Sequence, residues 1–494
     1  MGRNTIVEYY GERPFQKCGY CKGRKCKINH VEFFGREETG HRCGYCKSKE
    51  SSIADGMWAH YLTCQDYQDL LDRGWRRSGK YCYKPIMDRT CCPQYTIRLD
   101  VTNAKLRKSQ KKVIKNFNKY LTTGIRPKQP SKTDQKASGG GEVDEDNNCI
   151  DEPCGGAREV KAPKMDISFT GGIVNGADPS KPKCRKAKEV RKERKQMKQK
   201  VNTPHEQITS KQNKNKEKTY EEWIDGVPED AKIKFEVKLV RCCPEDEDFK
   251  QTFRQELEVY QKYQIEIHKD DPDEVDERQF RRFLCEGPLV PVYGDDDEDE
   301  DLDINGIPSC GLGAFHQQYY LDGRLVAVGV LDILPNIVSS KYLFYDPEYQ
   351  FLSLGTYSAL REIYFIRSLY RESLSIKYYY MGFYIHSCLK MKYKGSFFPS
   401  YLLCPETYMW KSIEDCFEKL DASKYARLEE DKNKVAEQVN ASDSLILHKG
   451  RAMPFQVFIS LVSSESEISD HKNTVEEYTT LVGEACKSIL LFRS

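Results

Sequence analysis

The stretch that decides the fold is AFHQQYYLDGRLVAVGVLDIL at residues 314–334. Two β-rich runs meet there at Asp322-Gly323, a pair that tolerates the positive φ angles of a tight turn, so the stretch predicts a β-hairpin. The segments that follow are SSKYLFYDP at 339–347, SLGTYSALREIYFIRSLY at 353–370 and YYYMGFYIH at 378–386. They predict a strand, a helix and a strand. Together these elements predict an α/β (α+β) architecture with a mixed β-sheet.

Strand, strand, strand, helix, strand is the order of the GNAT-type acyltransferase fold, whose mixed sheet splays to admit an acyl donor. Upstream, KIKFEVKLV at 232–240 predicts a strand, and residues 248–263 predict a helix that RQFRRFL at 278–284 continues. The acidic insertion at 294–303 is most simply a surface loop. We therefore predict a GNAT-like catalytic domain over residues 223–494.

The amino-terminal part is rich in cysteine. CGYC at 43–46 and the pair in CCPQYTI at 91–97 can bring four sulfur atoms around one metal. Adjacent cysteines would face opposite ways in an extended chain, but the following Pro93 indicates a turn. Small buried hydrophobic residues are the alternative reading of such thiols. The predicted ligands of Zn²⁺ or an iron–sulfur cluster are Cys43, Cys46, Cys91 and Cys92.

CGYC occurs a second time, with Cys18 and Cys21 as an alternative first pair. We favour the copy at Cys43 and Cys46, because it lies close to the aromatic segment GMWAH at 56–60. Residues 1–121 then form a cysteine-rich metal-binding or cluster-binding domain. Its last segment, AKLRKSQKKVIKNFNKYL at 104–121, predicts a basic helix that packs on this domain.

Composition limits the class of protein. Of 494 residues, 38% are hydrophobic and 31% charged, and there are 20 cysteines. Residues 1–15 lack an apolar signal segment, and no run approaches the roughly 18 apolar residues of a membrane span. We expect no membrane association and a reducing compartment, the cytoplasm and also the nucleus. There the cysteines are thiols or metal ligands.

A net charge of +2 hides strong segregation of charge. Residues 122–222 are mainly Lys, Gly, Ser, Asn, Asp and Pro, which predicts a disordered basic linker. Within it, KAKEVRKERKQMKQK at 186–200 fits a nuclear import signal, an arm that attracts tRNA, or a solvated charge run. The sequence leaves these three readings open.

Both halves of the chain resemble one family. GMWAHYLT, DYQDLLDRGWRRSGKYCYKP and CCPQYTI in the first half, and FHQQYYLDGRLVAVGVLDILP, SSKYLFYDPEYQFLSLGTYSALREI, YYYMGFYIHSCLKMKYKG and LLCPETY in the second, resemble the eukaryotic arginyl-tRNA–protein transferases. The resemblance covers residues 1–121 and 223–425. It implies transfer of arginine from arginyl-tRNA to the α-amino group of proteins that begin with Asp, Glu or oxidised Cys. This transfer marks them for ubiquitin-dependent degradation by downstream ligases. It further implies an iron–sulfur cluster on the cysteine pairs.

The implied chemistry needs neither ATP nor CoA, because the donor is already an activated ester, and we expect a monomer. The acceptor amine has a pKa of about 7.7 to 8.0, so the site must accept a proton and hold an oxyanion. Asp332 ends a strand where the sheet should splay and could orient or deprotonate the amine, or it could cap the turn before Pro335. Tyr345, Tyr357 and Tyr384 are candidates for relaying the proton or stacking on the terminal adenine.

Cations near aromatic rings are candidates for binding substrate or tRNA, with a surface ion-pair network as the alternative. In the run at 72–85 they are Arg73, Trp75, Arg76, Arg77 and Lys80.

Two further groups of cations stand in the second half. Lys390, Lys392 and Lys394 alternate, so in an extended strand all three would share one face and bind phosphate or carboxylate, with a solvated strand edge as the alternative. Arg361 could reach an acidic substrate side chain, or pair with Glu362 or Glu372. The helix amino terminus at Gly355 would suit an anionic group.

Two rival functions remain. A CoA-dependent N-acyltransferase would carry Arg/Gln-x-x-Gly-x-Gly/Ala before the helix, whereas QFLSLGT at 350–356 holds one glycine. A non-enzymatic metal-finger adaptor that binds RNA or acidic amino termini would account for the first hundred residues but leaves the splayed sheet without a role.

Overall fold

The hairpin at 314–334 is the centre of an eight-stranded mixed sheet. Its strands are β8 (Gly313–Leu321) and β9 (Arg324–Ile333), and both turn residues, Asp322 and Gly323, have positive φ angles of 48° and 78°. β10 (Ile337–Tyr345), α7 (Leu354–Glu372) and β11 (Tyr378–Tyr384) follow. The predicted order of strands and helix is therefore confirmed, and the sheet reads β13-β12-β6-β11-β10-β9-β8-β7.

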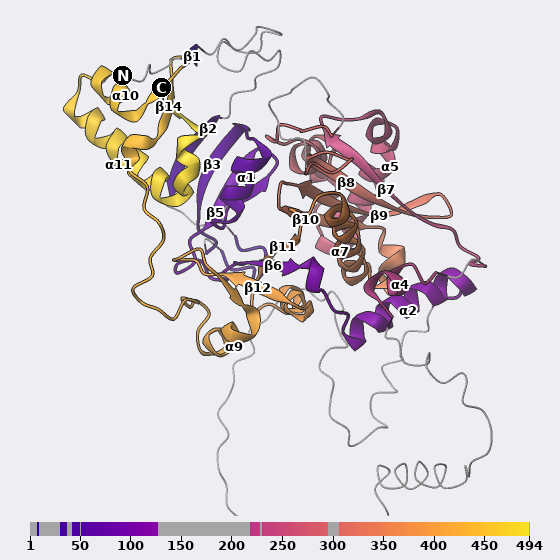
Figure 1. The fold of residues 1–494 in the computed structure, drawn as a ribbon. Coiled ribbons are helices and arrows are strands. Elements are labelled where there is room, and N and C mark those ends of the chain that lie inside the picture. The colour runs from indigo at the N-terminus through magenta and orange to yellow at the C-terminus, as the bar shows by residue number, and fades with distance from the viewer. Residues whose placement is uncertain are drawn as a thin grey trace, which may run out of the picture. The chain divides into compact units, whose positions relative to one another are not determined.

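The figures show a computed structural model, which describes residues 7–8, 30–36, 42–49, 51–126, 218–227, 230–294 and 306–493 (Figure 1). Predictions for Cys18 and Cys21, for most of the linker and for the acidic insertion lie outside the described residues. Among the described helices, none has both the length and the apolar composition that crossing a membrane requires.

Strands β10 and β11 part near the middle of the sheet. They pair in parallel only from Ile337–Ser339 to Tyr378–Tyr380. Directly beyond, both strands are irregular: β10 shifts register against β9 across Lys341, and β11 shifts against β6 between Tyr380 and Phe383. Such bulges bend strands and redirect side chains. The carboxyl halves of these two parallel strands therefore have no hydrogen bonds to each other, as expected for the splayed sheet that the sequence predicts.

Strand β6 (Tyr95–Asp100) lies in the same sheet as the hairpin, between β11 and β12 (Ser400–Leu403). The sequence instead assigns these residues to the cysteine-rich domain. Ile97 and Leu99, which share one face of the strand, are almost fully buried, whereas Arg98 and Asp100 on the other face are half-buried. The strand pairing thus does not follow the predicted boundary at residue 121. β7 (Phe235–Cys243) and β13 (Trp410–Ser412) form the two edges.

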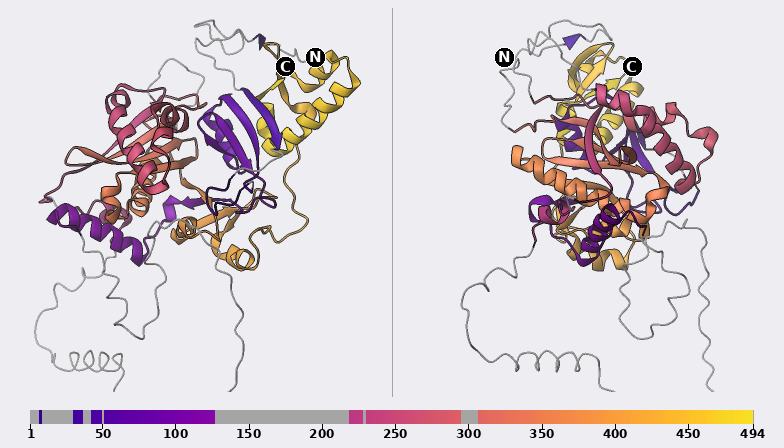
Figure 2. Two further views of the ribbon diagram at one scale, coloured as in Figure 1. Left: turned by 180° about the vertical axis from the view of Figure 1, so that it is seen from behind. Right: turned by 90° about the vertical axis from the view of Figure 1, so that its right-hand side faces the viewer.

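The chain's two ends share the other eight-stranded sheet. Its pairing order is β1 (Val7–Glu8), β15 (Arg451–Pro454), β14 (Leu445–His448), β16 (Leu490–Arg493), β2 (His30–Arg36), β3 (Ala54–Tyr61), β5 (Tyr81–Pro85) and β4 (Arg76–Ser78). β16 pairs in parallel with β2, so the yellow carboxy-terminal strands extend the indigo sheet (Figure 2). Helices α10 (Phe455–Leu461) and α11 (Glu465–Val482) pack against this extension.

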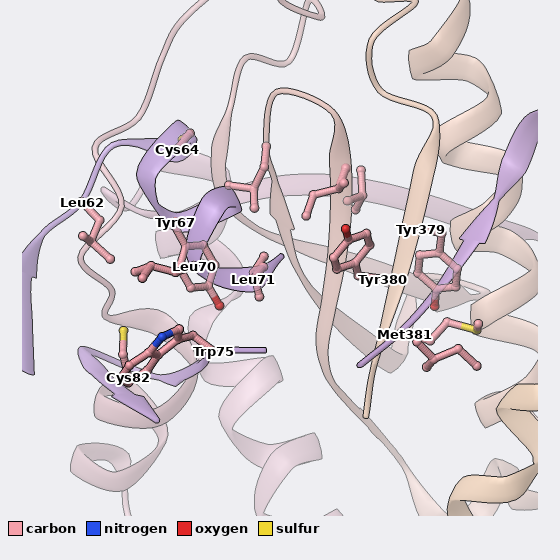
Figure 3. Packing of buried hydrophobic residues seen from close by; sticks show 14 of the residues in the cluster. Leu62, Cys64, Tyr67, Leu70, Leu71, Trp75, Cys82, Tyr379, Tyr380 and Met381 are labelled. Carbon is pink, nitrogen blue, oxygen red and sulfur yellow. The ribbon is translucent and has the colours of Figure 1, made fainter. Parts of the chain in front are cut away.

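Several helices bury apolar side chains in the hydrophobic cores. α1 (Cys64–Leu71) buries Tyr67, Leu70 and Leu71 in the same cluster as Trp75 and Cys82 (Figure 3). The predicted helix at 248–263 is α5 (Glu247–Tyr263), and α6 (Glu277–Phe280) continues into the π-helical turn η5 (Arg281–Cys285). α9 (Ile413–Ala422) packs on β12 and β13.

Helix α2 (Lys108–Thr123) confirms the predicted basic helix but not its predicted packing partner. It lies on α7 and on the short α4 (Tyr220–Ile224). It does not lie on the sheet that contains β2, β3, β5 and β4, which we call the cysteine-rich sheet. Aromatic packing holds α2 on α7, because Phe117 of α2 stacks on Tyr357 of α7 with ring centroids 3.7 Å apart.

Candidate functional site

A buried ion pair joins the two sheets at the base of the site. Arg77 on β4 donates from Nη2 to Asp332 Oδ1 at 2.5 Å and from Nε to Oδ2 at 3.0 Å. Their side chains are 1% and 0% exposed. Burial alone would lower the pKa of Arg77, but the Asp332 charge outweighs it and the pKa lies above its ordinary value. Asp332 therefore holds Arg77 and does not cap the turn before Pro335, one of the two roles predicted for it.

Lys341 lies beside this pair, in the bulge of β10. Its Nζ is buried and has no hydrogen-bond partner among the described residues. Burial, with the positive charge of Arg77 next, lowers the pKa of Lys341 to about 8. Tyr67, whose ring faces the Arg77 guanidinium at 5.7 Å, also has a buried hydroxyl without a partner in the described part of the chain. Buried polar groups normally have partners, so these two atoms are suited to a ligand.

Glu362 on α7 lies at the same parting of the strands, under the opposite face of the sheet. It is 1% exposed, and the Tyr379 hydroxyl donates to its Oε2 at 2.5 Å. Burial raises the pKa of Glu362 to about 7, against hydrogen bonds from Tyr379 and Ser340. Gly329 on β9 leaves room for this carboxylate, since a Cβ there would stand 3.0 Å from Glu362 Oε1. A carboxyl group that titrates near neutrality can exchange protons with a substrate.

The three alternating lysines do not form the predicted strand. They lie in α8 (Leu389–Lys392) and the 3-10 turn η7 (Tyr393–Ser396), where alternate residues point different ways. Lys390 and Lys392 are exposed. Lys394 instead reaches back to β11 and donates to the Phe383 carbonyl at 3.0 Å. Burial, then the charge of Arg76, lowers the pKa of Lys394 to about 7.

In the cationic and aromatic run at 73–77, Trp75, Arg76 and Arg77 are buried and Arg73 is half-buried. Trp75 is fully buried and donates to the Leu481 carbonyl, and Arg73 donates to the carbonyls of Leu481 and Thr480. Arg76 donates to the carbonyl of its neighbour Trp75 at 2.7 Å. These residues therefore do not form the surface ion-pair network weighed as the alternative.

Lys80 lines a cavity of about 350 Å³ between the cysteine-rich sheet and the α5–η5 helices. Phe283 of its helical wall packs on Tyr342 of β10, with ring centroids 5.1 Å apart. Tyr81 of the other wall stacks on Tyr83, which in turn contacts Phe383 of β11. The two walls thus connect to the two strands that part. The lining residues are Trp58, Ser78, Lys80, Tyr81, Tyr260, Gln264, Gln279, Arg282, Phe283 and Glu286.

The remaining predicted residues have partners other than Lys341 and Glu362. Tyr345 and Tyr357 belong to the aromatic core around α2. The Arg361 guanidinium lies over the rings of Phe235 and Tyr364. Tyr384 shares a 2.6 Å hydrogen bond with His386. α7 begins one residue before Gly355, which has open space where its side chain would be.

Sequence reasoning missed the roles of Lys341 and Glu362. Each carried a signal: Lys341 is the one charge in a strand that is otherwise apolar or aromatic after Ser340, and Glu362 shares a helix face with Ala359 and Ile366.

The four predicted cysteines come together. The sulfur atoms of Cys43, Cys46, Cys91 and Cys92 all lie within 4.8 Å of one another, so they could hold a metal ion. Backbone bonds shape the site: Cys91 N donates to the Ser51 carbonyl at 2.9 Å. Hydrogen bonding with Ser48 lowers the pKa of Cys46 to about 6, which favours the thiolate that binds metals.

The cysteine group also contacts the segment that follows β11. Cys43 and Cys92 pack against Ile385 and Cys388, directly before α8. The group therefore supports the chain that leads to Lys394.

Known proteins resemble the chain over its whole length. The family description "Arginine-tRNA-protein transferase, N terminus" matches residues 41–112, and "Arginine-tRNA-protein transferase, C terminus" matches residues 255–404. Arginyl-tRNA–protein transferase 1 of Drosophila melanogaster is 36% identical, over 99% of this chain and 99% of its own length. Arginyl-tRNA–protein transferase 2 of Arabidopsis thaliana is 35% identical, over 87% and 78%. The aspartate/glutamate leucyltransferase of a Campylobacter jejuni strain is 31% identical over 21% of this chain and 39% of its own. With its parted sheet and its four-cysteine group, this chain belongs to the arginyl-tRNA–protein transferase family.

Proposed function

We propose that this chain transfers arginine from arginyl-tRNA to the α-amino group of proteins that begin with Asp or Glu. The observation that carries the proposal is the parting of β10 and β11 between Lys341 and Glu362, in a member of this family. The name of the Campylobacter relative, an aspartate/glutamate leucyltransferase, supports an acidic acceptor. Such a product would feed ubiquitin-dependent degradation.

The reaction forms an amide between the acceptor nitrogen and the arginyl carbon, and it breaks the ester bond to the tRNA ribose. The acceptor ammonium must lose a proton, and Glu362 is the group to take it, because its raised pKa matches that of an amine. The carbonyl oxygen of the ester becomes negative in the transition state, and the Lys341 ammonium, which has no hydrogen-bond partner among the described residues, can hold it. The nitrogen loses a second proton as the tetrahedral intermediate collapses. Of the two protons, one leaves on the ribose hydroxyl and the other goes to solvent, and the activated ester supplies the free energy, so no nucleotide is consumed.

Purified protein with arginine-labelled arginyl-tRNA should label a peptide that begins with Asp and leave an otherwise identical peptide that begins with Leu unlabelled. Scintillation counting of the separated peptides measures this. Label on neither peptide, or acetyl transfer from acetyl-CoA in a parallel reaction, would contradict the proposed function.

Replacing Glu362 with Gln should lower kcat about 10²- to 10⁴-fold, the usual contribution of a general base. A carboxyl group accepts a proton only when ionised, so the wild-type rate should rise as the pH passes about 7, and the variant should lose that limb. Glu372→Gln, on the same helix but bonded to Ser309, is the control. A folded Glu362→Gln protein that keeps the wild-type pH profile would rule out this role.

We further propose that the cavity beside Lys80 receives the acidic side chain of the acceptor. Lys80 and Arg282 point two cations at it, and neither forms an ion pair with a carboxylate among the described residues. The links from its walls to Tyr342 and Phe383 place it next to the parted strands.

Lys80→Gln with Arg282→Gln should raise KM for the Asp peptide about 10- to 100-fold, because one charge-assisted hydrogen bond contributes roughly 1.5 to 3 kcal/mol. kcat at saturation should change little, since the reacting groups remain. Arg278→Gln, an exposed cation on α6 outside the cavity, is the matched control. Equal losses with the double variant and the control would place the acidic side chain elsewhere.

We also propose that the four cysteines hold an iron–sulfur cluster. Four thiolates suit such a cluster and suit zinc, and the resemblance of the chain to its family favours the cluster. Protein purified without oxygen should contain iron and acid-labile sulfide and absorb visible light. Cys43→Ser should remove them, whereas Cys18→Ser with Cys21→Ser, and Cys404→Ser, should not. Stoichiometric zinc without sulfide would show that the site binds zinc and not a cluster. Metal retained by the Cys43→Ser variant would contradict both a cluster and a zinc site at these cysteines.

A further inference from the structure

Helix α2 and its flanks form an acid-free cationic surface. Residues 105–126 contain eight Lys or Arg residues and no Asp or Glu. Lys108, Lys112, Lys115 and Lys119 repeat at i, i+4, i+7 and i+11, so they form one stripe that is about 16 Å long at 1.5 Å per residue. The exposed cations are Lys105, Arg107, Lys108, Lys112, Lys115, Lys119 and Arg126.

The opposite face of α2 is already covered. Ile114, Phe117 and Leu121 are at most 1% exposed and pack in the cores. A helix that lies on a membrane inserts its apolar face between the lipids, and here that face is occupied by the protein. What α2 offers to a partner is therefore charge alone.

These cations are not neutralised within the described parts of the chain. None of the seven exposed cations forms an ion pair there, although two lie near aromatic rings: Lys115 over Trp223 and Arg126 over Phe351. The three acids of the neighbouring α4 region have partners other than these cations, and Glu222 accepts from the Thr219 backbone N–H at 2.7 Å. Glu221 pairs with Arg367 and Arg371, and Asp225 accepts from the Tyr364 hydroxyl.

The stripe ends where the sheet opens. β10 and β11 are parallel and part toward their carboxyl ends, and α7 starts from the end of β10 through the 3-10 turn η6 (Pro347–Leu352). The last turns of α2 pack at this start: Phe117 stacks on Tyr357, and Tyr120 contacts Phe351 with ring centroids 5.1 Å apart. A polyanion on α2 would therefore have an end close to the parted strands.

We infer that the exposed stripe of α2 binds the phosphate backbone of the tRNA that delivers the aminoacyl ester. The inference rests on the proposed function for the identity of the RNA, but its physical basis is the unpaired charge beside the open edge. Lysine side chains contact phosphates without reading sequence, so the stripe supplies affinity and orientation, not the choice of tRNA. It holds the acceptor arm while the 3′ end enters between β10 and β11.

The test compares Lys112→Gln with Lys119→Gln against a control pair of exposed, unpaired lysines, Lys432→Gln with Lys472→Gln. Binding of deacylated tRNA is measured by fluorescence anisotropy over a series of salt concentrations. The α2 pair should weaken binding by tenfold or more at low salt. It should also reduce the slope of log K against log salt by about 1 for each phosphate that the variant no longer neutralises. Circular dichroism confirms that both proteins are folded.

Steady-state transfer adds a second readout. The α2 pair should raise KM for arginyl-tRNA and leave kcat and KM for the peptide unchanged, while the control pair changes none of these. An unchanged salt slope, or equal loss in both pairs, would overturn the inference. So would binding of wild-type protein to phosphatidylserine vesicles that the α2 pair abolishes while its tRNA affinity stays intact. Failure of wild-type protein to transfer arginine would count against the proposed function only, because tRNA binding is read without turnover.

Discussion

The buried pair of Arg77 and Asp332 is the constraint on which the site depends. Removing two charges from water costs several kcal/mol for each ion, and only close bidentate geometry offsets that cost. Here both carboxylate oxygens are used by one guanidinium, whose remaining nitrogen donates to the Gly79 carbonyl. β4 of one sheet is thereby fixed to β9 of the other. Both oxygens of Asp332 are engaged by Arg77, and Lys341 beside it has no hydrogen-bond partner in the described part of the chain, so its ammonium stays available to a ligand.

The exchange of strands between the sheets reinforces this constraint. β6 comes from the amino-terminal part and pairs with β11 and β12, while β16 from the carboxyl end pairs with β2. Neither sheet can form from a continuous half of the chain, so the cysteine group and the parted strands are built by the same long-range pairings. Such pairings must close very long loops before any contact forms, which ties the order of one sheet to that of the other.

Local sequence patterns predicted where helices and strands form better than they predicted which of these elements pair or pack with one another. Asp322-Gly323 located the hairpin, because a tight turn needs two positive φ angles that few residue pairs tolerate. The spacing of the cysteines grouped all four correctly. The strands that pair with β6 lie about 280 to 300 residues further along the chain, and period-two alternation does not encode a partner. The lysine alternation after Cys388 misled for a related reason: LKMKYK contains good helix formers and no β-branched residue, so a helical turn prevailed. Lys341 and Glu362 gained their roles only through tertiary burial, which no local pattern fixes.

The turn between β10 and α7 explains why the donor's phosphates should be held by side chains. Enzymes that cradle a phosphate on backbone N–H groups leave that backbone bare with several glycines. Here Leu352, Leu354 and Tyr357 fill the turn and are buried against α2. Ser353 takes a left-handed conformation that glycine usually supplies, which leaves Gly355 as the one bare position. The side chains that fill this turn, and so prevent its backbone from binding a phosphate, are the ones that pack against α2. The same packing therefore brings the lysines of α2 next to the turn, where side chains rather than backbone N–H groups can bind the phosphates.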